Sequence, residues 1–459
     1  MHDTLNTWWL WISADELRIE QQQLKDEGRD ASRLEPRFRR LIRQGNEKLV
    51  RWEAQEEAQA LFDDAQQLPR RRGYPFREPS DLAGIRKLRP RGPRRFRKTL
   101  SDKALMNHLL GAWLGRCAGC LLGKPFEGTR SWDIEAYLKA SGQWPLCRYP
   151  RFGGAGKAKK AFQRLLDHAP GGFLMRTFDS IDHMPIDDDT NYTTAGLLIV
   201  REKGPDFSPA DVAHFWMQRL PLEATCTAER VAYRNFAMNI APPESASFRN
   251  PFREWIGAQI RADAFGYVNV GRPERAAEFA WRDACISHIK NGIYGEMLMA
   301  AMIAAAPFCK TLDELLGVGL SEIPGTSRLH ADLSMVRDWR KEGISYDEAV
   351  NRIHQRWNEE FGHDWCHTNT NAVICAVALL WGEGDFGTSI GLAVMPGYDT
   401  DCNGATVGSI LGMRLGADAV PRHWKAKLHN TLKTSLTGYE TVRIDTIARH
   451  TLETAINIR

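Results

Sequence analysis

The sequence predicts a mainly helical protein, and three features support this. Residues 1–68 are rich in Glu, Gln, Arg and Leu and contain few Gly or Pro, which is the composition of helices. Glycines at positions 111, 115, 119 and 123 recur every four residues, which places them on one face of a helix. Apolar runs at 297–307 and 372–381 have the length of buried helices and are too short to span a bilayer.

Residues 1–68 are predicted to form an N-terminal helical extension. Two apolar stripes run through it, at Trp9, Leu10, Ile12 and Leu17 and at Leu34, Phe38, Leu41 and Ile42. The simplest arrangement is an antiparallel helical hairpin with a turn near residues 28–32. No function for this extension follows from its sequence.

Residues 69–101 differ in kind from what precedes them. Between Arg70 and Lys98 there are twelve basic residues against two acidic ones, although the whole chain has a net charge of only +4. Prolines and glycines interrupt this segment, so we predict a linker that lies on the acidic remainder of the protein. The alternative is a nucleic-acid or phosphate-binding patch, but a recognisable nucleic-acid fold and an aromatic stacking platform are missing.

The main body begins at residue 102 and extends to 459. Its four regularly spaced glycines imply that another backbone approaches this helix closely, because glycine otherwise disfavours a helix. The helix should end near Gly123, because Pro125 biases the preceding residue away from helix. Glu127 would then lie on a loop just beyond it, which is also where an ordinary exposed glutamate would lie.

Cys117 and Cys120 form the only Cys-x-x-Cys pair. A structural zinc site would need a second pair at matching spacing, and a redox motif would need a strand before it. We therefore interpret both cysteines as small, buried helix residues.

Two aspartate clusters carry the strongest chemical signal. Asp187, Asp188 and Asp189 stand side by side before the apolar run 195–200, and Asp399 and Asp401 lie in the glycine-flanked segment 395–408. Buried carboxylates must be paired, hydrogen-bonded or bound to a cation. The triplet alone would also suit a helix start, where Asp is a good N-cap. Together, the clusters favour a site for Mg²⁺, Mn²⁺ or Ca²⁺, which prefer hard oxygen ligands.

Three motifs resemble those of the ADP-ribosylglycohydrolase family. They are Asp-Asp-Asp-Thr at 187–190, Gly-Tyr-Asp-Thr-Asp-Cys-Asn-Gly-Ala-Thr-Val-Gly at 397–408, and the segment 119–127 that ends in Glu127. They occur in the expected order, and the resemblance covers roughly residues 105–437. It implies an all-α, compact multi-helix bundle that holds two Mg²⁺ ions, with Mn²⁺ as a possible substitute, and that removes ADP-ribose from modified residues.

The resemblance also implies the residues of the site. Glu127 and Asp188 are the candidate catalytic residues, and three roles remain open for Glu127: metal ligand, substrate contact or acid/base. The candidate metal ligands are Asp187, Asp188, Asp189, Asp399, Asp401 and Cys402.

Three positions depart from the family pattern. Asp187 stands where the family often has Thr, Cys402 stands at a family Thr, and Cys120 stands at a family Asp. A thiol is a poor ligand for Mg²⁺, so coordination by Cys402 is in doubt. The Asp-Thr-Asp-Cys-Asn-Gly-Ala-Thr version resembles a bacterial branch of the family.

Two further segments resemble parts of the family's substrate cleft. The first contains Gly257 and Ala258, and the second contains His288, Asn291, Gly292 and Tyr294. A glycine-containing helix start leaves backbone N–H groups free for phosphate. Tyr294 suits stacking on an adenine and equally suits a buried core position.

Two other regions remain open. The Gly-rich stretch 145–185 predicts a long loop, either disordered or functional. His363 and His367 are four residues apart, but no third zinc ligand is evident, so we place them as polar residues near the mouth of the cleft.

The function that we expect is a metal-dependent hydrolase that cleaves the ribosyl glycosidic bond of ADP-ribosylated protein or of a related compound. The alternative is a non-catalytic ADP-ribose-binding or crystallin-like structural member of the family. The expected partner is an ADP-ribose-containing small molecule or modified protein, without membrane or nucleic acid. Nine cysteines and an N-terminus without a secretory signal pattern favour the cytoplasm. The linkage cleaved and the oligomeric state do not follow from the sequence.

Overall fold

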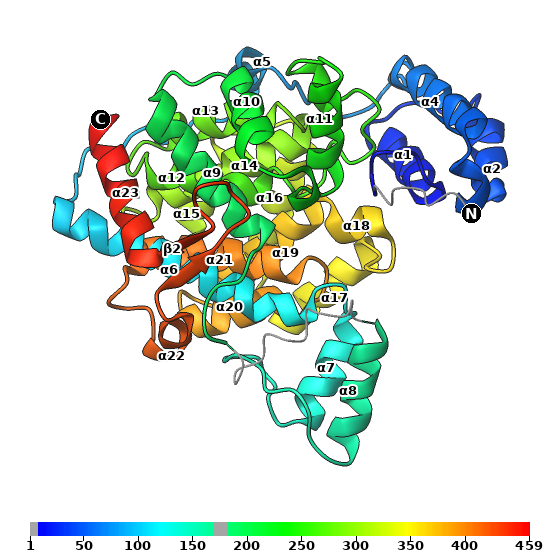
Figure 1. Ribbon diagram of the computed structural model, residues 1–459. Coiled ribbons are helices and arrows are strands. Elements are labelled where there is room, and N and C mark those ends of the chain that lie inside the picture. The colour runs from blue at the N-terminus through cyan, green and yellow to red at the C-terminus, as the bar shows by residue number, and fades with distance from the viewer. Residues whose placement is uncertain (1–7, 169–180) are drawn as a thin grey trace.

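The computed structural model describes residues 8–168 and 181–459, and helices make up nearly all of its regular structure (Figure 1). The all-α prediction is therefore confirmed. Within the described residues the only strands are β1 (Thr431–Lys433) and β2 (Thr441–Arg443), which form one short antiparallel hairpin with Leu432 opposite Val442. No helix of this part of the chain has both the length and the hydropathy needed to cross a membrane.

The N-terminal extension is more than a hairpin. It contains α1 (Ala14–Asp26), α2 (Glu35–Gln44), the one-turn α3 (Asn46–Leu49) and α4 (Trp52–Gln66). The first turn falls at residues 28–32 as predicted, but Gly45 adopts a φ of 70° and breaks the second half of the hairpin. The extension has a small apolar core of its own that includes Leu24, Phe38 and Phe62. It lies at one end of the molecule, beside α18 (Gly362–Cys366) (Figure 1).

The basic segment runs along the body and is held there by ion pairs. Arg89 and Arg94 both contact Glu322, at 2.7 and 2.8 Å, and Arg86 contacts Glu278 at 2.7 Å. A short helix that we did not predict, α5 (Leu82–Leu88), interrupts it, with the Asp81 side chain capping its first turn. The linker thus lies on acidic groups of the body, as its charge suggested.

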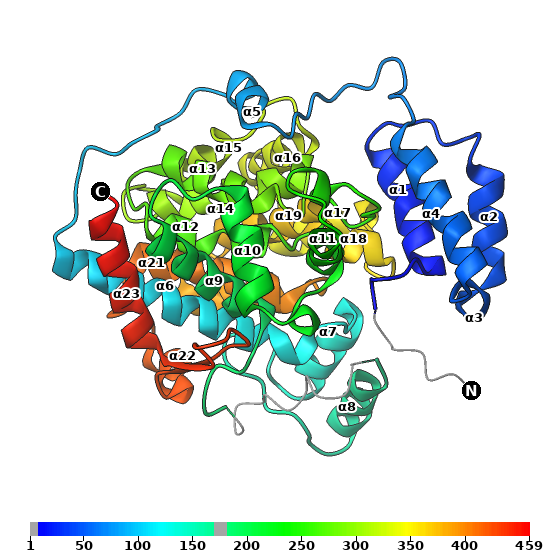
Figure 2. The same cartoon turned by 45° about the horizontal axis from the view of Figure 1, so that its top comes forward.

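The centre of the body is a close crossing of α6 (Asp102–Gly123) and α21 (Thr400–Leu415) (Figure 2). A Cβ added at Gly111, Gly115 or Gly119 would lie within 3.0 Å of a backbone carbonyl of Gly412, Gly408 or Gly404 respectively, and the reverse holds for the three glycines of α21. Both glycine rows therefore lie in the interface, and the pairing shows that the helices run antiparallel. This confirms the predicted close backbone approach and identifies its partner.

The stretch 145–185 is not a simple loop, because it contains α8 (Lys157–His168), which packs against α7 (Ser131–Ala140). Phe162 of α8 and Phe152 stack with centroids 5.6 Å apart, and both lie against Tyr137 of α7. This apolar contact stabilises a helix that the glycines around it concealed. Residues 169–180 of the same stretch lie outside the described residues.

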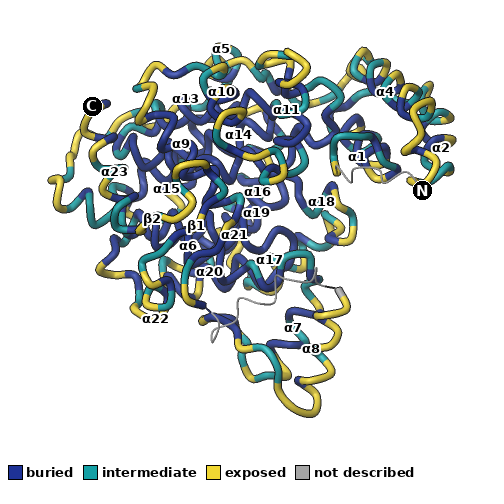
Figure 3. Tube along the Cα trace, in the orientation of Figure 1, coloured by how far each residue is buried: buried dark blue, intermediate teal, exposed yellow. Residues whose placement is uncertain are grey.

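The other helices surround the central pair, and buried residues run through the whole body (Figure 3). They are α9 (Asp188–Lys203), α10 (Pro209–Arg219), α11 (Thr227–Ala237), α12 (Asp263–Tyr267), α13 (Pro273–Ala284), α14 (Lys290–Ala305), α15 (Leu312–Leu320), α16 (Arg328–Glu342), α17 (Tyr346–Arg356), α19 (Thr368–Trp381), α20 (Phe386–Val394), α22 (Arg422–Lys425) and α23 (Ile444–Asn457). Short 3-10 turns are η1 (Lys124–Phe126), η3 (Leu222–Ala224), η4 (Glu244–Ala246), η5 (Gln259–Arg261) and η6 (Ala426–Leu428).

Candidate metal and active site

Three helix ends meet to form the candidate site. Because α6 and α21 are antiparallel, the C-terminal end of α6 lies beside the N-terminal end of α21, where Gly123 meets Thr400. The helix α6 ends at Gly123, as predicted, and η1 places Glu127 just beyond it. The third end is the start of α9, where Asp187 is the N-cap and its side chain accepts the backbone N–H of Asp189 at 3.0 Å. The triplet is thus a helix start and also part of an acidic cluster.

The acidic side chains fall into two groups that share Asp401. One group contains Cys120, Asp187, Asp189 and Asp401, and the other contains Asp399, Asp401 and Cys402. Within each group, the potential ligand atoms all lie within 4.8 Å of one another, and every member is buried. Segments separated by more than 200 residues therefore converge on one point.

Two cations hold the first group from different sides. The buried guanidinium of Arg116 donates to Oδ1 of Asp189 at 2.8 Å and also pairs with Asp263 at 3.0 Å. The ammonium of Lys124 pairs with Oδ2 of Asp187. Burial opposes ionisation of Asp187, but Lys124 and the hydrogen bonds to this carboxylate keep its pKa below the usual value. These cations neutralise only part of the cluster.

The charge that remains fits a divalent cation. Oδ2 of Asp189 and Oδ1 of Asp401 are buried without a hydrogen-bond partner. Burial and the neighbouring carboxylates raise the pKa of Asp189, Asp399 and Asp401. Orphaned, mutually repelling carboxylate oxygens are the donors that Mg²⁺ and Mn²⁺ accept and that a protein otherwise has to protonate. The residues present therefore match a hard divalent cation.

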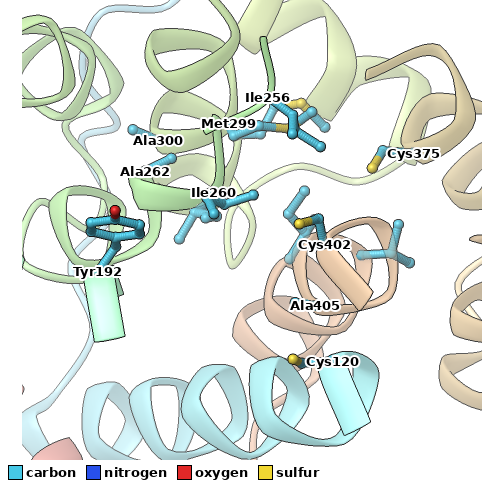
Figure 4. Close-up of a cluster of buried hydrophobic side chains, with 14 of the residues drawn as sticks. Cys120, Tyr192, Ile256, Ile260, Ala262, Met299, Ala300, Cys375, Cys402 and Ala405 are labelled. Carbon is cyan, nitrogen blue, oxygen red and sulfur yellow. The ribbon is translucent and has the colours of Figure 1, made fainter. Parts of the chain in front are cut away.

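Three cysteine thiols lie beside the carboxylates. Figure 4 shows two of these residues, Cys120 on α6 and Cys402 on the neighbouring α21. Cys120 donates to Asp187, and both Cys402 and Cys366 donate to Asp399, the latter at 3.7 Å. Burial raises the pKa of each of these thiols, so they stay protonated. A neutral thiol that donates to a carboxylate orients that carboxylate and is not itself a ligand for Mg²⁺. This explains how cysteines fit at positions 120 and 402.

Asp188 and Glu127 differ from the buried ligand groups, because both are partly exposed and neither belongs to the two groups. Burial, followed by the charges of Asp187 and Asp401, raises the pKa of Asp188 to about 8. Burial and then Asp401 raise the pKa of Glu127 well above its usual value, although Lys124 opposes this. Each carboxyl thus faces the cluster and holds a proton readily.

The comparison with known families decides the assignment. The family model described as ADP-ribosylglycohydrolase matches residues 101–455. The chain belongs to the ADP-ribosylglycohydrolase family. A solved structure described as an "ADP-ribosylglycohydrolase-related protein complex" is 18% identical with a TM-score of 0.46, and the match covers 78% of this chain and 100% of that chain. A search of curated proteins found no match.

Gly257 and Ala258 lie in the turn that leads to Arg261, which donates to the carbonyl of Gly257 at 3.2 Å. Both are buried, and a Cβ at Gly257 would meet the Glu229 carboxylate, which would have to shift. Glu229 pairs with Arg261 at 2.8 Å, and burial raises its pKa to about 7. The next turn is tied to the site directly, because Arg116 also donates to the carbonyl of Ile260 at 2.6 Å.

The segment with His288, Asn291, Gly292 and Tyr294 does not form a phosphate cradle. All four residues are buried, and the backbone N–H of Asn291 at the start of α14 is bound by the Glu254 carboxylate at 3.1 Å. The Tyr294 hydroxyl donates to the carbonyl of Pro79, and Nδ1 of His288 lies 2.8 Å from Ser287 Oγ. Tyr294 is therefore a core tyrosine, and a carboxylate holds the helix start that we had expected to be free for phosphate.

The same carboxylate binds the extension and the linker to the body. Glu254 accepts from Gln23 of α1 at 2.7 Å and from Arg328 at 2.7 Å, and Arg328 also pairs with Glu78 of the linker. Buried ion pairs between Arg253 and both Glu20 and Glu27 of α1 complete the contact. Asn291 and Tyr294, which the resemblance placed in the substrate cleft, contact Glu78 and Pro79 of the linker.

His363 and His367 lie under the extension. The third member of this cluster is Asp26 of α1, which the sequence did not reveal. Oδ2 of Asp26 is 2.8 Å from Nε2 of His363. Nδ1 of His363 accepts from the Trp255 indole, and Nδ1 of His367 accepts from the N–H of Asn369. The pair His363–Asp26 is thus a hydrogen-bonded contact between extension and body. Nε2 of His367 is buried beside it without a hydrogen-bond partner among the described residues.

Arg116 and Lys124 are the site residues that sequence reasoning missed. Both lie in the segment that carries the early family motif or directly before it, and Arg116 is a charged residue inside a glycine-rich, buried helix face. A buried charge needs a partner, so its presence there was a signal for nearby carboxylates.

Proposed function

We propose that this protein is a metal-dependent glycohydrolase that cleaves the ribosyl glycosidic bond of ADP-ribosylated protein or of a related ADP-ribosyl or ribosyl compound. Family membership supports hydrolase activity in general. The observation that carries the finer proposal is Asp401, a buried carboxylate shared by two groups of potential ligands, with one oxygen left without a partner. Two Mg²⁺ ions, or Mn²⁺ in their place, would be held by Asp187, Asp189, Asp399 and Asp401.

Cleavage of the glycosidic bond builds positive charge on the ribose. Bound divalent ions supply orientation of the sugar hydroxyls and a lowered pKa for an attacking water. Arg116 and Lys124 fix the orientation of Asp189 and Asp187 through the ion pairs described above. Glu127 and Asp188, whose pKa values are both raised, are each suited to hold a proton and donate it to the leaving group.

The structural, crystallin-like alternative has no feature in its favour. A purely structural protein gains nothing from burying carboxylates that repel one another, because each costs stability unless it is neutralised.

The test is release of ADP-ribose from a panel of substrates. Peptides ADP-ribosylated on arginine or serine, ADP-ribosylated DNA, O-acetyl-ADP-ribose and simple nucleosides are incubated with the full chain in Mg²⁺, in Mn²⁺ and in EDTA. We expect turnover of at least one ribosyl compound, loss of it in EDTA, and loss of it in Asp401→Asn. The control Asp206→Asn changes an exposed loop aspartate and should turn over normally. Turnover that persists in EDTA and in Asp401→Asn would refute the proposal.

A further inference from the structure

A cavity lies between the basic linker and the body, away from the acidic cluster. Its volume is about 620 Å³, within the range of small-molecule sites of about 300–1,000 Å³. The linker is fixed over it where the N–H of Phe96 donates to the carbonyl of Gly271 at 2.8 Å and the Phe96 ring stacks on Phe308. Figure 2 shows the linker passing around the body here to reach α6. The cavity is therefore formed by the linker in its fixed position against the body.

The lining of this cavity is strongly cationic. Five arginines and one lysine line it, and no aspartate or glutamate does: Arg95, Arg97, Lys98, Arg272, Arg275 and Arg459. Three other arginines of the linker, Arg86, Arg89 and Arg94, are paired with glutamates of the body. The described lining of the cavity therefore supplies no acidic partner for the cations that it gathers.

Most of these cations have no partner in the described part of the chain. The side chains of Arg95, Arg97, Lys98 and Arg272 make no hydrogen bond or ion pair there, whereas Arg275 is fixed by a hydrogen bond to the carbonyl of Ile458 at 2.7 Å. Four unpaired cationic side chains around one fixed arginine suit a ligand that accepts several hydrogen bonds.

The cations also repel one another. Burial, followed by the charges of Arg95 and Arg459, lowers the pKa of Arg272. Burial and then Arg272 lower the pKa of Arg275 to about 10, despite the nearby Glu278. Glu278 already pairs with Arg86, at 2.7 Å, and with Arg282. It therefore does not neutralise the cations of the cavity. A bound anion would relieve this repulsion.

The cavity and the acidic cluster lie at opposite ends of α6. Leu105 lines the cavity and Cys120 belongs to the cluster, so about 22 Å of helix separates them at 1.5 Å per residue. One small ligand cannot occupy both places.

We propose that this cationic cavity is a binding site for a small anion with two or more phosphate groups, separate from the catalytic site. Guanidinium groups match phosphate oxygens in forked pairs, which favours phosphate over a single carboxylate. The linker and the body both line the cavity, so a bound anion would contact both parts and link them. This inference does not depend on the proposed glycohydrolase activity.

Calorimetric titration of the full chain with pyrophosphate, in EDTA, tests the site. We expect saturable binding that weakens about tenfold in the double variant Arg95→Gln/Arg272→Gln, because two unpaired donors are lost. Neither residue has a structural partner, so the fold should persist, as a melting curve will verify. The matched control Arg91→Gln removes an exposed cation of the same linker that does not line the cavity, and should bind like the unmodified chain. Asp401→Asn should also bind normally.

Further arms use ATP and a short single-stranded oligonucleotide. ATP binding that is lost in the same double variant supports the proposal. An absence of pyrophosphate binding, or equal weakening by Arg91→Gln, would overturn it. Binding of the oligonucleotide while pyrophosphate and ATP stay inert would replace the small-anion site by a nucleic-acid surface.

Discussion

The crossing of α6 and α21 can be tested by adding a single methyl group. Gly115 lies one turn before the acidic cluster, and its Cβ would meet the backbone carbonyl of Gly408. A carbonyl in a buried helix cannot move aside as a flexible side chain can. The helices would have to separate by about 1 Å to restore the 3.0 Å that real Cβ atoms keep. Gly115→Ala therefore tests how closely the two helices pack, and it changes no polar group.

The expected cost follows from two opposing effects. Alanine favours a helix over glycine by about 1 kcal/mol, which would stabilise the variant if space allowed. Overpacking a buried interface costs about 1–3 kcal/mol, and separating the helices adds loss of close packing along the remaining glycine pairs. We expect a net loss of about 2 kcal/mol, which lowers the melting temperature by about 2 °C for a chain of this length.

The matched control is Gly317→Ala in α15. Gly317 is also a helical glycine, but a Cβ there meets nothing within 4 Å. This variant should gain up to about 1 kcal/mol. Thermal melts of both variants, with and without Mn²⁺, measure the difference. Gly115→Ala should also weaken metal binding, because α21 carries Asp401 and the end of α6 places Lys124 against Asp187. Equal melting temperatures for the two variants would refute the close-packed crossing.

Three further outcomes follow from the site and its surroundings. Glu127→Gln should lower kcat about 100-fold with little change in KM, as expected for a lost general acid, and an unchanged kcat would remove that role. Asp188→Ala should abolish ADP-ribose release while its melting temperature stays close to that of the unmodified chain; normal turnover would exclude Asp188. Arg328 and Lys290 outweigh burial and hold the pKa of Glu254 at about 2, below its ordinary 4.5. The ionised Glu254 carboxylate therefore stabilises the folded state by on the order of 3 kcal/mol above pH 4.5, and this stabilisation is lost as the pH falls towards 2. In an acid titration the Glu254→Gln variant should not show this loss of stability. An acid transition identical to that of the unmodified chain would contradict the prediction.

Local patterns in the sequence predicted the elements well where spacing alone determines them. The four-residue glycine spacing located α6 and the close approach of another backbone, and Pro125 located its end. The glycines at 404, 408 and 412 have the same spacing, so the partner helix was also recognisable in principle. The triplet at 187–189 indicated both a helix start and a charged cluster, and the structure shows both.

The remainder depended on long-range contacts that a local pattern does not contain. Asn291 and Tyr294 matched a substrate-cleft pattern, but Glu254 and Pro79 hold them because the extension and linker dock there. Asp26 completes a trio with two histidines more than 300 residues away, which their spacing could not indicate. The helix α8 was hidden by flanking glycines, since its stability comes from aromatic packing against α7.

The most direct test of the central claim is a calorimetric titration of the full chain with Mn²⁺ and Mg²⁺. The buried oxygens of Asp189 and Asp401 without partners predict saturable binding of divalent ions. The double variant Asp399→Ala/Asp401→Ala should lose that binding while remaining folded. Heats that stay at the level of dilution, or binding that is unchanged in the double variant, would contradict a metal centre at this convergence of helices.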